Sequence, residues 1–351
     1  MTWSTRREVI GSALALAACE RPGASRAFES SPQPLKSVAP FPVGVAVQAE
    51  QLGVPSLAAL IASQFSQLTP EWQMKMEYIL QGDGSLRFTA PDAIADFAAH
   101  RGLRLFGHTL VWHAQRPAAF LGLDPNRATF HQAFANYIAQ VVGRYRGRCV
   151  GWDVVNEAVA EDGNGWRDSL WSERLGAFEH IRLAFELARR ADPDAVLLLN
   201  DYNLESIPAK RATFMRLAEA LLNAGAPLGG LGSQTHVNTD LADGAITTTV
   251  RDLARLGLPI HISEMDVSSA RMRGLTIPGL DQGSRRDALY AEAAGALMEL
   301  PSAQRFAMTV WGLRDRDSWL LRRNADDAPL LFDNSLRAKP ALAAIEAALK
   351  P

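Results

Sequence analysis

Two short segments of the chain each carry an apolar run into a carboxylate. The first is Trp152–Glu157, and the second is His261–Asp266, which contains Glu264. They are far enough apart in the sequence to lie on different strands of one large barrel. Cleavage of a glycosidic bond needs two carboxyl groups, one as the acid on the leaving oxygen and one as the nucleophile at the sugar carbon. The pair predicts this chemistry, with Glu157 as the acid and Glu264 as the nucleophile.

Polar neighbours of the two carboxylates fit these roles. Asn156 directly precedes Glu157 and could bind the sugar hydroxyl beside the reacting carbon. We expect the pKa of Glu157 to stay high because of the second carboxylate and partial burial. His236 and Asp266 could form a charge relay that holds Glu264 ionised and oriented. A single glutamate is usually a solvated surface charge, but an apolar strand leading into each one disfavours that interpretation.

The rest of the chain alternates short β-rich runs with amphipathic helical stretches. Eight strands are predicted, at Pro42–Val47, Ser66–Thr69, Leu103–Leu110, Val150–Val155, Val196–Asn200, Gly230–Thr235, Pro259–Ser263 and Phe306–Trp311. Eight helices are predicted, at Val54–Gln64, Pro91–His100, Arg127–Tyr145, Ser172–Arg190, Pro208–Asn223, Ile246–Leu256, Arg285–Leu300 and Pro340–Leu349. This alternation predicts an α/β fold, a (β/α)8 TIM barrel with a single catalytic domain. No Gly-rich nucleotide loop supports a doubly wound sheet.

Polar and aromatic residues gather at or just past the predicted strand ends, the face on which such barrels carry catalysis. They are Glu71, Lys75, His108, Trp112, Asn156, Glu157, Asn200, Gln234, His236, Glu264 and Trp311. One polar residue at a strand end is usually a cap or a turn. A cluster at most of the eight ends is hard to reach by chance, and it indicates an active site.

Metal chemistry is not expected, and neither is a cofactor. The sequence has no His-x-x-x-His pair on a predicted helix and no cluster of cysteine ligands. His108 and His113 are five residues apart, so on one strand their side chains would point to opposite faces.

Composition narrows the class of protein. The 351 residues are 48% hydrophobic with a net charge of -2, enough for one large α/β domain or two ordinary ones. The charge balance gives no reason to expect nucleic acid. Two cysteines, Cys19 and Cys149, exclude a framework of several disulfides. Cys149 enters a predicted strand, so we expect it to be buried as an apolar residue.

The first 19 residues are typical of an export signal. Arg6-Arg7 precedes a short apolar run and resembles a twin-arginine signal, and Leu16–Cys19 resembles a bacterial lipoprotein box with Cys19 lipidated. Ordinary cleavage near Ala17 or Ala18 remains the alternative. Residues 20–40 are predicted to be a tether, and residues 41–351 the barrel. We expect a protein exported from a bacterial cytoplasm, either periplasmic, anchored to the membrane through Cys19, or secreted.

The motifs, taken in their order along the chain, resemble those of glycoside hydrolase family 10, the retaining endo-1,4-β-xylanases. The matching segments are Glu71 with Met74-Lys75, Gly107–His113, Trp152–Ala158, Asn200–Asn203, Gly232–His236, Ile262–Asp266, Trp311-Gly312, Asp317–Trp319 and Pro329–Asp333. The resemblance spans roughly residues 42–349. It implies a TIM barrel that hydrolyses xylan by double displacement through a covalent glycosyl-enzyme intermediate, with Glu157 as acid/base and Glu264 as nucleophile. Xylan and xylo-oligosaccharides are the expected partners, and a monomer is expected.

The resemblance also implies a division of the binding residues. Lys75, His108, Trp112, Asn156, Gln234, Trp311 and Trp319 would line the glycone side around the reacting sugar, with Glu71 in the glycone segment and Asn200 at the end of the fifth strand. Tyr202 and Asn203 would lie toward the aglycone side.

Two residues depart from the family pattern. Trp72 stands where the family usually has Asn, and Met265 stands where an aliphatic residue is usual. The methionine is a swap of similar volume that should be tolerated. The indole should narrow or re-angle the remote glycone subsite and weaken the demand for a second glycone sugar. The alternative is that Trp72 turns away and packs on the neighbouring helix.

Two other functions are weighed beside xylan hydrolysis. One keeps the enzyme but changes the substrate to cellobiosides or short xylo-oligosaccharides, which rates on polymer and oligomer would separate. The other is a silent lipoprotein that only binds sugar. Loss of either carboxylate would favour it, but both Glu157 and Glu264 are present.

Overall fold

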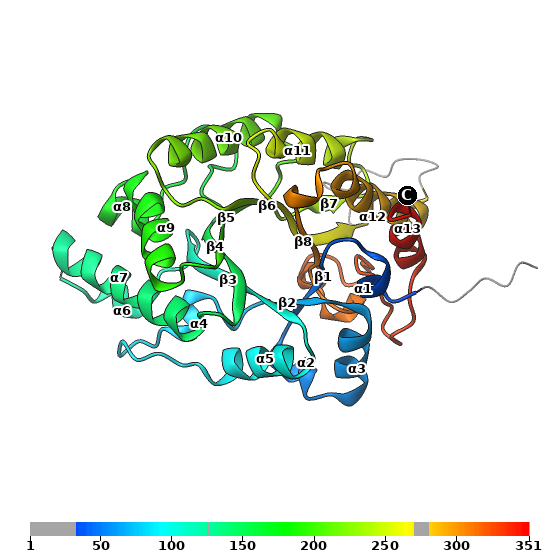
Figure 1. Cartoon of the computed structure of the whole chain (residues 1–351), viewed down its shortest axis with the longest axis horizontal. Helices are drawn as coiled ribbons and strands as arrows, with labels where there is room; N and C mark the ends of the chain where they lie inside the picture. Colours follow the sequence, from blue (N-terminus) through cyan, green and yellow to red (C-terminus); the bar gives the residue numbers. More distant parts are fainter. Residues whose placement is uncertain (1–32, 125, 270–280, 351) are drawn as a thin grey trace, which may run out of the picture. The chain divides into compact units, whose positions relative to one another are not determined.

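The computed structural model describes residues 33–124, 126–269 and 281–350. The predicted export signal and Cys19 lie outside the described residues. The TIM barrel predicted from the sequence is confirmed: eight parallel strands close into a ring, in the order β1-β2-β3-β4-β5-β6-β8-β9 and back to β1. Figure 1 shows the strands at the centre with helices around them.

The strands of the ring lie close to their predicted positions. They are β1 (Val43–Val47), β2 (Gln67–Pro70), β3 (Arg104–Trp112), β4 (Cys149–Asn156), β5 (Val196–Asp201), β6 (Gly230–Ser233), β8 (Ile260–Ser268) and β9 (Arg305–Val310). The predicted sixth strand is shorter than expected. It ends at Ser233, and Thr235 follows with φ +56°. A separate strand β7 (His236–Asn238) then pairs with the end of β8 beyond the ring.

The main helices follow the strands in alternation. They are α3 (Pro55–Gln64), α5 (Thr89–His100), α7 (Arg127–Arg144), α8 (Leu170–Leu175), α9 (Glu179–Ala191), α10 (Pro208–Asn223), α11 (Ala245–Ala254), α12 (Gln282–Met298) and α13 (Pro340–Ala348). Shorter helices are α1 (Leu35–Val38), α2 (Ala49–Leu52), α4 (Met76–Ile79) and α6 (Ala118–Leu121), with 3-10 turns at Ser302–Gln304, Asp315–Asp317 and Trp319–Arg322. No helix in the described part of the chain is long and apolar enough to cross a membrane.

Two predicted boundaries are wrong. The expected helix Ser172–Arg190 is two helices, α8 and α9, because Gly176 between them adopts φ +105°, which only glycine adopts readily. The expected tether 20–40 includes residues of the barrel domain. Helix α1 contacts α3 and α13, and Leu35 in it is fully buried, so the domain begins before residue 41.

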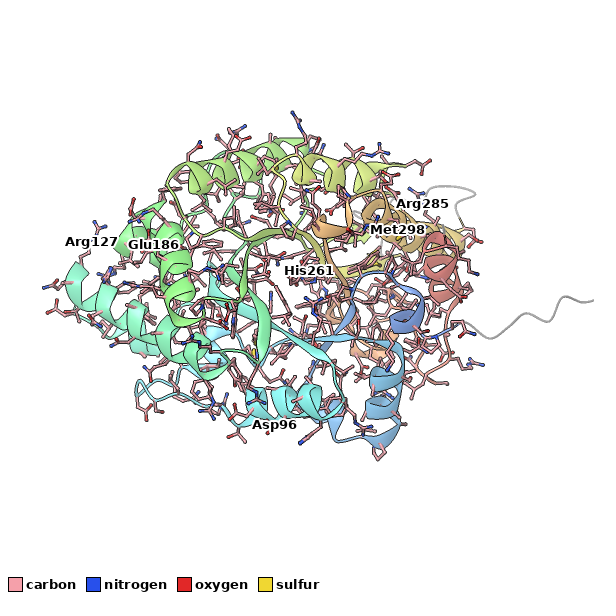
Figure 2. The ribbon with its side chains drawn as sticks, in the orientation of Figure 1. Asp96, Arg127, Glu186, His261, Arg285 and Met298 are labelled. Carbon is pink, nitrogen blue, oxygen red and sulfur yellow. The ribbon has the colours of Figure 1, made fainter. Side chains whose placement is uncertain are left out.

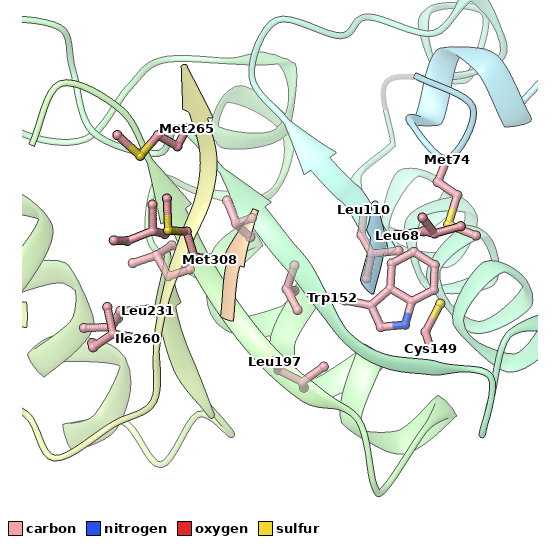
Figure 3. Packing of buried hydrophobic residues seen from close by; sticks show 14 of the residues in the cluster. Leu68, Met74, Leu110, Cys149, Trp152, Leu197, Leu231, Ile260, Met265 and Met308 are labelled. Atoms are coloured by element: carbon pink, nitrogen blue, oxygen red, sulfur yellow. The ribbon is translucent and has the colours of Figure 1, made fainter. Parts of the chain in front are cut away.

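The bulky side chain of Trp152 in β4 is fully buried in the main hydrophobic core. Figure 3 shows its indole beside Cys149 and Leu110. Gly107 on the neighbouring strand makes room, since a Cβ there would lie 2.1 Å from the Trp152 ring. Cys149 is buried and forms no disulfide, as the sequence predicts. Trp152 lies opposite Gly107 where β4 pairs with β3, and β4 carries Asn156 and leads directly to Glu157.

Inside the ring, His261 of β8 lies near the centre of the barrel (Figure 2). Its Nε2 lies 2.8 Å from Oγ1 of Thr309, and its ring is packed edge-on against Phe106 and tilted against Phe306. Burial lowers the pKa of His261 to about 3, so the ring is neutral in the folded protein. This layer closes the barrel below the polar face.

Candidate functional site

The two glutamates predicted from the sequence are carried by β4 and β8. Glu157 directly follows β4, whereas Glu264 lies within β8, which runs further than the sequence indicated. Three non-glycine residues just past β4, β5 and β6 have left-handed backbone: Glu157 (φ +59°), Asn203 (φ +58°) and Thr235 (φ +56°). Such conformations cost free energy and cluster at functional sites.

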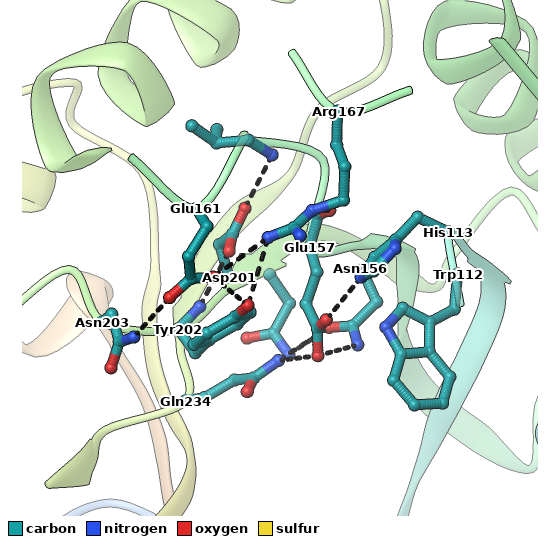
Figure 4. A network of polar contacts seen from close by, with 12 residues as sticks. Trp112, His113, Asn156, Glu157, Glu161, Arg167, Asp201, Tyr202, Asn203 and Gln234 are labelled. Carbon is teal, nitrogen blue, oxygen red and sulfur yellow. Dashed lines mark hydrogen bonds and ion pairs between the residues drawn. The ribbon is translucent and has the colours of Figure 1, made fainter. Parts of the chain in front are cut away.

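Glu157 is held by three side chains. His113 Nε2 lies 2.9 Å from its Oε2, and the amides of Gln234 and Asn156 each donate to its Oε1 at 3.2 Å. Figure 4 shows these groups converging on the carboxylate. The Arg167 Nε donates to the main-chain carbonyl of Glu157 at 3.2 Å, which fixes the backbone from the other side.

The expected high pKa of Glu157 does not hold for the enzyme without substrate. Burial raises the pKa, but the hydrogen bonds, led by the one from His113, outweigh burial, and the pKa lies below its ordinary value. The sequence argument omitted His113, the strongest of these donors. A substrate oxygen that displaces these donors would remove their effect and favour the protonated acid.

Glu264 is almost fully buried, with 4% of its surface exposed. The Asn200 amide donates to Oε1 at 2.8 Å, and His236 Nε2 lies 3.5 Å from Oε2. Lys75 adds a positive charge nearby, since its electrostatic interaction with Glu264 is the largest of its charge interactions. These contacts orient the carboxylate and surround it with hydrogen-bond donors and positive charge.

The two residues expected to form a relay, His236 and Asp266, lie beside Glu264 and contact each other. His236 Nδ1 forms an ion pair with Asp266 Oδ2 at 2.9 Å, and the indole N–H of Trp319 donates to the same oxygen at 2.9 Å. Burial lowers the pKa of His236, but Asp266 and Glu264 outweigh burial and raise it to about 10. His236 is therefore an imidazolium at neutral pH, charged next to Glu264.

One amide network joins the two carboxylates. Asn200 Nδ2 donates both to Glu264 Oε1 and to Asn156 Oδ1, the latter at 2.9 Å, and Gln234 Nε2 donates to Asn156 Oδ1 at 3.1 Å. Ser263 Oγ donates to Asn200 Oδ1 at 2.6 Å. Because Asn156 also donates to Glu157, both carboxylates are fixed by one set of buried side chains.

His108 lies at the floor of the site. Its Nδ1 lies 2.8 Å from Asp153 Oδ2, and its ring meets Trp311 edge-on with the centroids 5.1 Å apart. Burial places the pKa of His108 well below its ordinary value, and that of Asp153 well above. His113 does not point away from this site as expected. It follows the end of β3, whose pairing with β4 shifts between His108 and Val111, so strand alternation does not extend to it.

The glycone segment places a cation among aromatic rings. Lys75 Nζ lies 4.7 Å from the ring centroids of both Trp72 and Trp112 and 5.9 Å from that of Trp311. Burial lowers the pKa of Lys75, and Glu264 and Glu71 oppose that effect. Glu71 accepts a hydrogen bond from Gln48 at 2.9 Å, and burial raises its pKa.

Tyr202 and Asn203 lie on the opposite side, beyond β5. The Tyr202 hydroxyl donates to Glu161 Oε2, and Asn203 Nδ2 donates to Glu161 Oε1 at 3.0 Å. Arg167 Nη2 donates to the Tyr202 hydroxyl at 3.1 Å, so this group joins the contacts of Glu157 (Figure 4). Below it, the fully buried Lys210 pairs with Asp201 at 2.9 Å.

Within the described residues, His108, Asp153 and Glu264 have ligand atoms within 4.8 Å of one another. The spacing would suit an ion, but several of these atoms already make hydrogen bonds. His108 Nδ1 contacts Asp153, and Glu264 Oε1 accepts from Asn200. Lys75 places its own positive charge beside the same carboxylates. The arrangement serves two hydrogen-bonded carboxylates.

The structure brings the predicted residues together and adds others. His113, Asp153, Glu161 and Arg167 were not predicted as site residues. Asp153 could have been found, because it lies on the catalytic strand four residues before Glu157. Arg167 and Glu161 lie in the loop after β4, and no local pattern in the sequence marks them.

Comparisons with known proteins agree with this geometry. The profile of glycosyl hydrolase family 10 matches residues 35–348. Endo-1,4-beta-xylanase A of Cellvibrio japonicus is 36% identical over 348 residues, which cover 90% of this chain and 56% of that protein. The chain thus spans little more than half of that relative. Endo-1,4-beta-xylanase B of Paenibacillus barcinonensis is 34% identical over 312 residues, covering 85% of this chain and 92% of that protein.

A solved structure gives the same result for the fold. The structure of a thermostable mutant of the Cellvibrio japonicus xylanase Xyn10A superposes with a TM-score of 0.83 at 34% identity. The superposition covers 90% of this chain and 99% of that one.

Proposed function

The chain belongs to glycosyl hydrolase family 10, and from that premise we propose that it is a retaining endo-1,4-β-xylanase. The observation that carries the proposal is a pair of glutamates with different surroundings, a partly exposed Glu157 and a buried Glu264. Glu157 accepts only from groups that can be displaced or can share a proton, whereas Glu264 is held by Asn200 and faces the His236 imidazolium. Two carboxyls in different environments are the acid and nucleophile of a retaining glycosidase.

In the first step the Glu264 carboxylate attacks the anomeric carbon of the bound sugar. The bond to the leaving oxygen breaks as Glu157 transfers its proton to that oxygen. The Asn156 amide lies between the two carboxylates, where it can bind the hydroxyl next to the reacting carbon. The product of this step is a glycosyl ester on Glu264 and a released aglycone.

In the second step Glu157, now ionised, takes a proton from water. The water oxygen attacks the anomeric carbon from the side the aglycone left, and Glu264 departs as a carboxylate. Two displacements at one carbon retain its configuration. His113 and Gln234 can stabilise the ionised Glu157 that forms between the steps, since both contact it in the free enzyme.

The residues around the pair suit a xylan chain. Trp112, Trp311 and Trp319 offer aromatic surface, and Lys75, His108, Asn200 and Gln234 offer polar groups, on one side of the reacting centre. Tyr202 and Asn203 lie toward the loop after β5 and would contact the aglycone. Glu71 completes the glycone segment.

Product analysis on purified xylan tests the proposal. We expect a ladder of short xylo-oligosaccharides early in the reaction, and proton NMR should show the β anomer of each new reducing end first. An early α anomer would contradict the assigned roles. If the protein cleaves short oligosaccharides or cellobiosides but not polymeric xylan, the substrate assignment would change. The retaining mechanism assigned to Glu157 and Glu264 would still stand.

Export and lipidation belong to the same proposal. The sequence of residues 1–19 supports a signal peptide with Cys19 as an acylated first residue of the mature protein. Such a protein would be anchored to a membrane with the barrel on a tether, acting as a monomer. Mass spectrometry of the mature protein from a bacterial host would decide this. An unmodified N-terminus at another residue would refute lipidation and keep export.

A further inference from the structure

Trp72 is the large aromatic side chain at the site that is most open to solvent. It is 48% exposed, whereas Trp311 is 5% exposed. The alternative expected from the sequence, that Trp72 packs away on the neighbouring helix, does not fit this exposure. An indole left half in water next to a binding site is available for a ligand.

The indole has a fixed place relative to the reacting centre. Lys75 Nζ lies 4.7 Å from the centroids of Trp72 and Trp112, so these two rings cannot be farther apart than twice that distance. Among the charges around Lys75, Glu264 interacts with it most strongly. Trp72 therefore lies beside Trp112 and shares with it the lysine whose charge interacts most strongly with Glu264.

One face of the indole is already occupied. The Lys75 ammonium lies over the ring, a cation–π contact that holds the indole in place, and the remaining surface is exposed. Because Lys75 is 7% exposed and anchored among three indoles, it acts as a rigid support beneath Trp72. A supported aromatic ring with free surface is a platform for the apolar face of a sugar.

We propose that Trp72 is a specificity-determining residue that binds the second sugar on the glycone side by stacking against its ring. This inference rests on the proposed xylanase function. The indole can donate one hydrogen bond and accept none, so recognition depends on the face of the pyranose and little on its hydroxyls. The subsite should accept a xylosyl unit whose hydroxyls are substituted. The size of indole alone led us to expect a narrowed subsite. Because the ring is held against Lys75, we propose that it stacks on the sugar and does not block it.

The test compares two chromogenic substrates, 4-nitrophenyl β-xyloside and 4-nitrophenyl β-xylobioside. Only the second places a sugar next to the reacting one, so the ratio of their kcat/KM values reports the contact with Trp72. Trp72→Ala should lower the xylobioside-to-xyloside ratio about tenfold, and Trp72→Phe, which keeps a ring, should lower it less. Leu222→Ala, which removes an exposed apolar side chain from α10, is the matched control and should keep the wild-type ratio.

Each other outcome has a distinct meaning. A ratio that is unchanged in Trp72→Ala, with the fold intact by circular dichroism, would overturn the stacking role. A ratio that rises would show that Trp72 narrows the subsite, and would also overturn it. If the wild-type protein hydrolyses neither substrate nor xylan, the proposed function itself fails. Weaker inhibition by xylobiose in Trp72→Ala than in the control would support stacking independently of turnover.

Discussion

Nε2 of His113 lies 2.9 Å from Oε2 of Glu157, at the point where the chain leaves β3. A hydrogen bond at this distance needs one proton between the two atoms, so either the imidazole donates to the carboxylate or the carboxyl donates to the imidazole. The pair therefore keeps a proton next to the glycosidic oxygen in both states.

His113→Ala should move the basic limb of the kcat/KM profile to higher pH. The acid is active only when protonated, and the hydrogen bond from His113 helps to lower the pKa of Glu157. Without it that pKa rises, so the protonated form persists to higher pH. Initial rates on xylo-oligosaccharides across pH measure the shift. His131→Ala, an exposed histidine on α7, is the control, and equal basic limbs in all three proteins would contradict the coupling.

His236→Ala should move the opposite limb. The imidazolium, with its pKa raised to about 10, stays charged through the working range and lies 3.5 Å from the nucleophile. Its removal takes a positive charge away from the carboxylate, so the acid limb should shift to higher pH and activity at low pH should fall first. The comparison is kcat/KM against pH for the variant and the wild type. An acid limb that stays in place while substrate still binds would remove His236 from this role.

The two carboxylates should fail differently. Glu264→Ala should abolish turnover of every substrate, because no glycosyl ester can form. Glu157→Ala should lose on the order of 10²–10⁴-fold on xylan, the usual size of acid catalysis, yet still form the ester from aryl xylobiosides with good leaving groups. A burst of nitrophenol in stopped flow would show this. Equal losses on activated and natural substrates in both variants would contradict the roles.

How far the sequence predicts this site depends on where each residue lies along the chain. Glu157, Glu264 and Asn200 follow apolar runs on buried strands. The change from an apolar strand to a polar residue is therefore enough to place them at one face of the barrel. His113 was misplaced because strand alternation was extended past the end of β3. The low pKa of Glu157 depends on that contact, so the error in position became an error in electrostatics.

Two features of the fold could not be predicted from local sequence patterns, for physical reasons. The break between α8 and α9 depends on the positive φ of Gly176 within an otherwise continuous helical pattern. The apolar residues near the start of the domain, such as Leu35, are buried through contacts with α3 and with α13, which lies at the other end of the chain. Contacts between distant parts of the chain bury such residues. The composition of residues 20–40, which resembles a tether, does not reveal those contacts.

Chelation should leave activity unchanged. The cluster of His108, Asp153 and Glu264 has ligand spacing, but its atoms contact one another and Asn200, and no step of the mechanism uses an ion. Rates on xylan before and after EDTA, with Mg²⁺, Ca²⁺ or Zn²⁺ added back, would measure this. Loss on chelation with recovery by one ion would require a metal in the chemistry. A change in melting temperature alone would indicate a structural ion.

Acid should unfold the protein through its buried neutral histidines. His261 has a pKa of about 3 in the folded barrel and His180 one of about 4, both lowered by burial, whereas an unfolded histidine titrates near its ordinary value of about 6.5. Between those limits the unfolded chain binds protons that the folded protein does not. Their contribution to stability is complete above about pH 6.5 and is lost as the pH falls toward the folded values.

The size of the effect follows from the same relation. Each such histidine should lower the free energy of unfolding by about 1.4 kcal/mol for every pH unit in this window. Urea unfolding at pH 7, 6, 5 and 4.5 would measure the slope. His261→Phe, which keeps a ring against Phe106 and Phe306, should be less stable at pH 7 because Thr309 loses its partner, yet show a shallower slope. His131→Ala should keep the wild-type slope, and an unchanged slope in His261→Phe would mean that His261 is not the group that acid titrates.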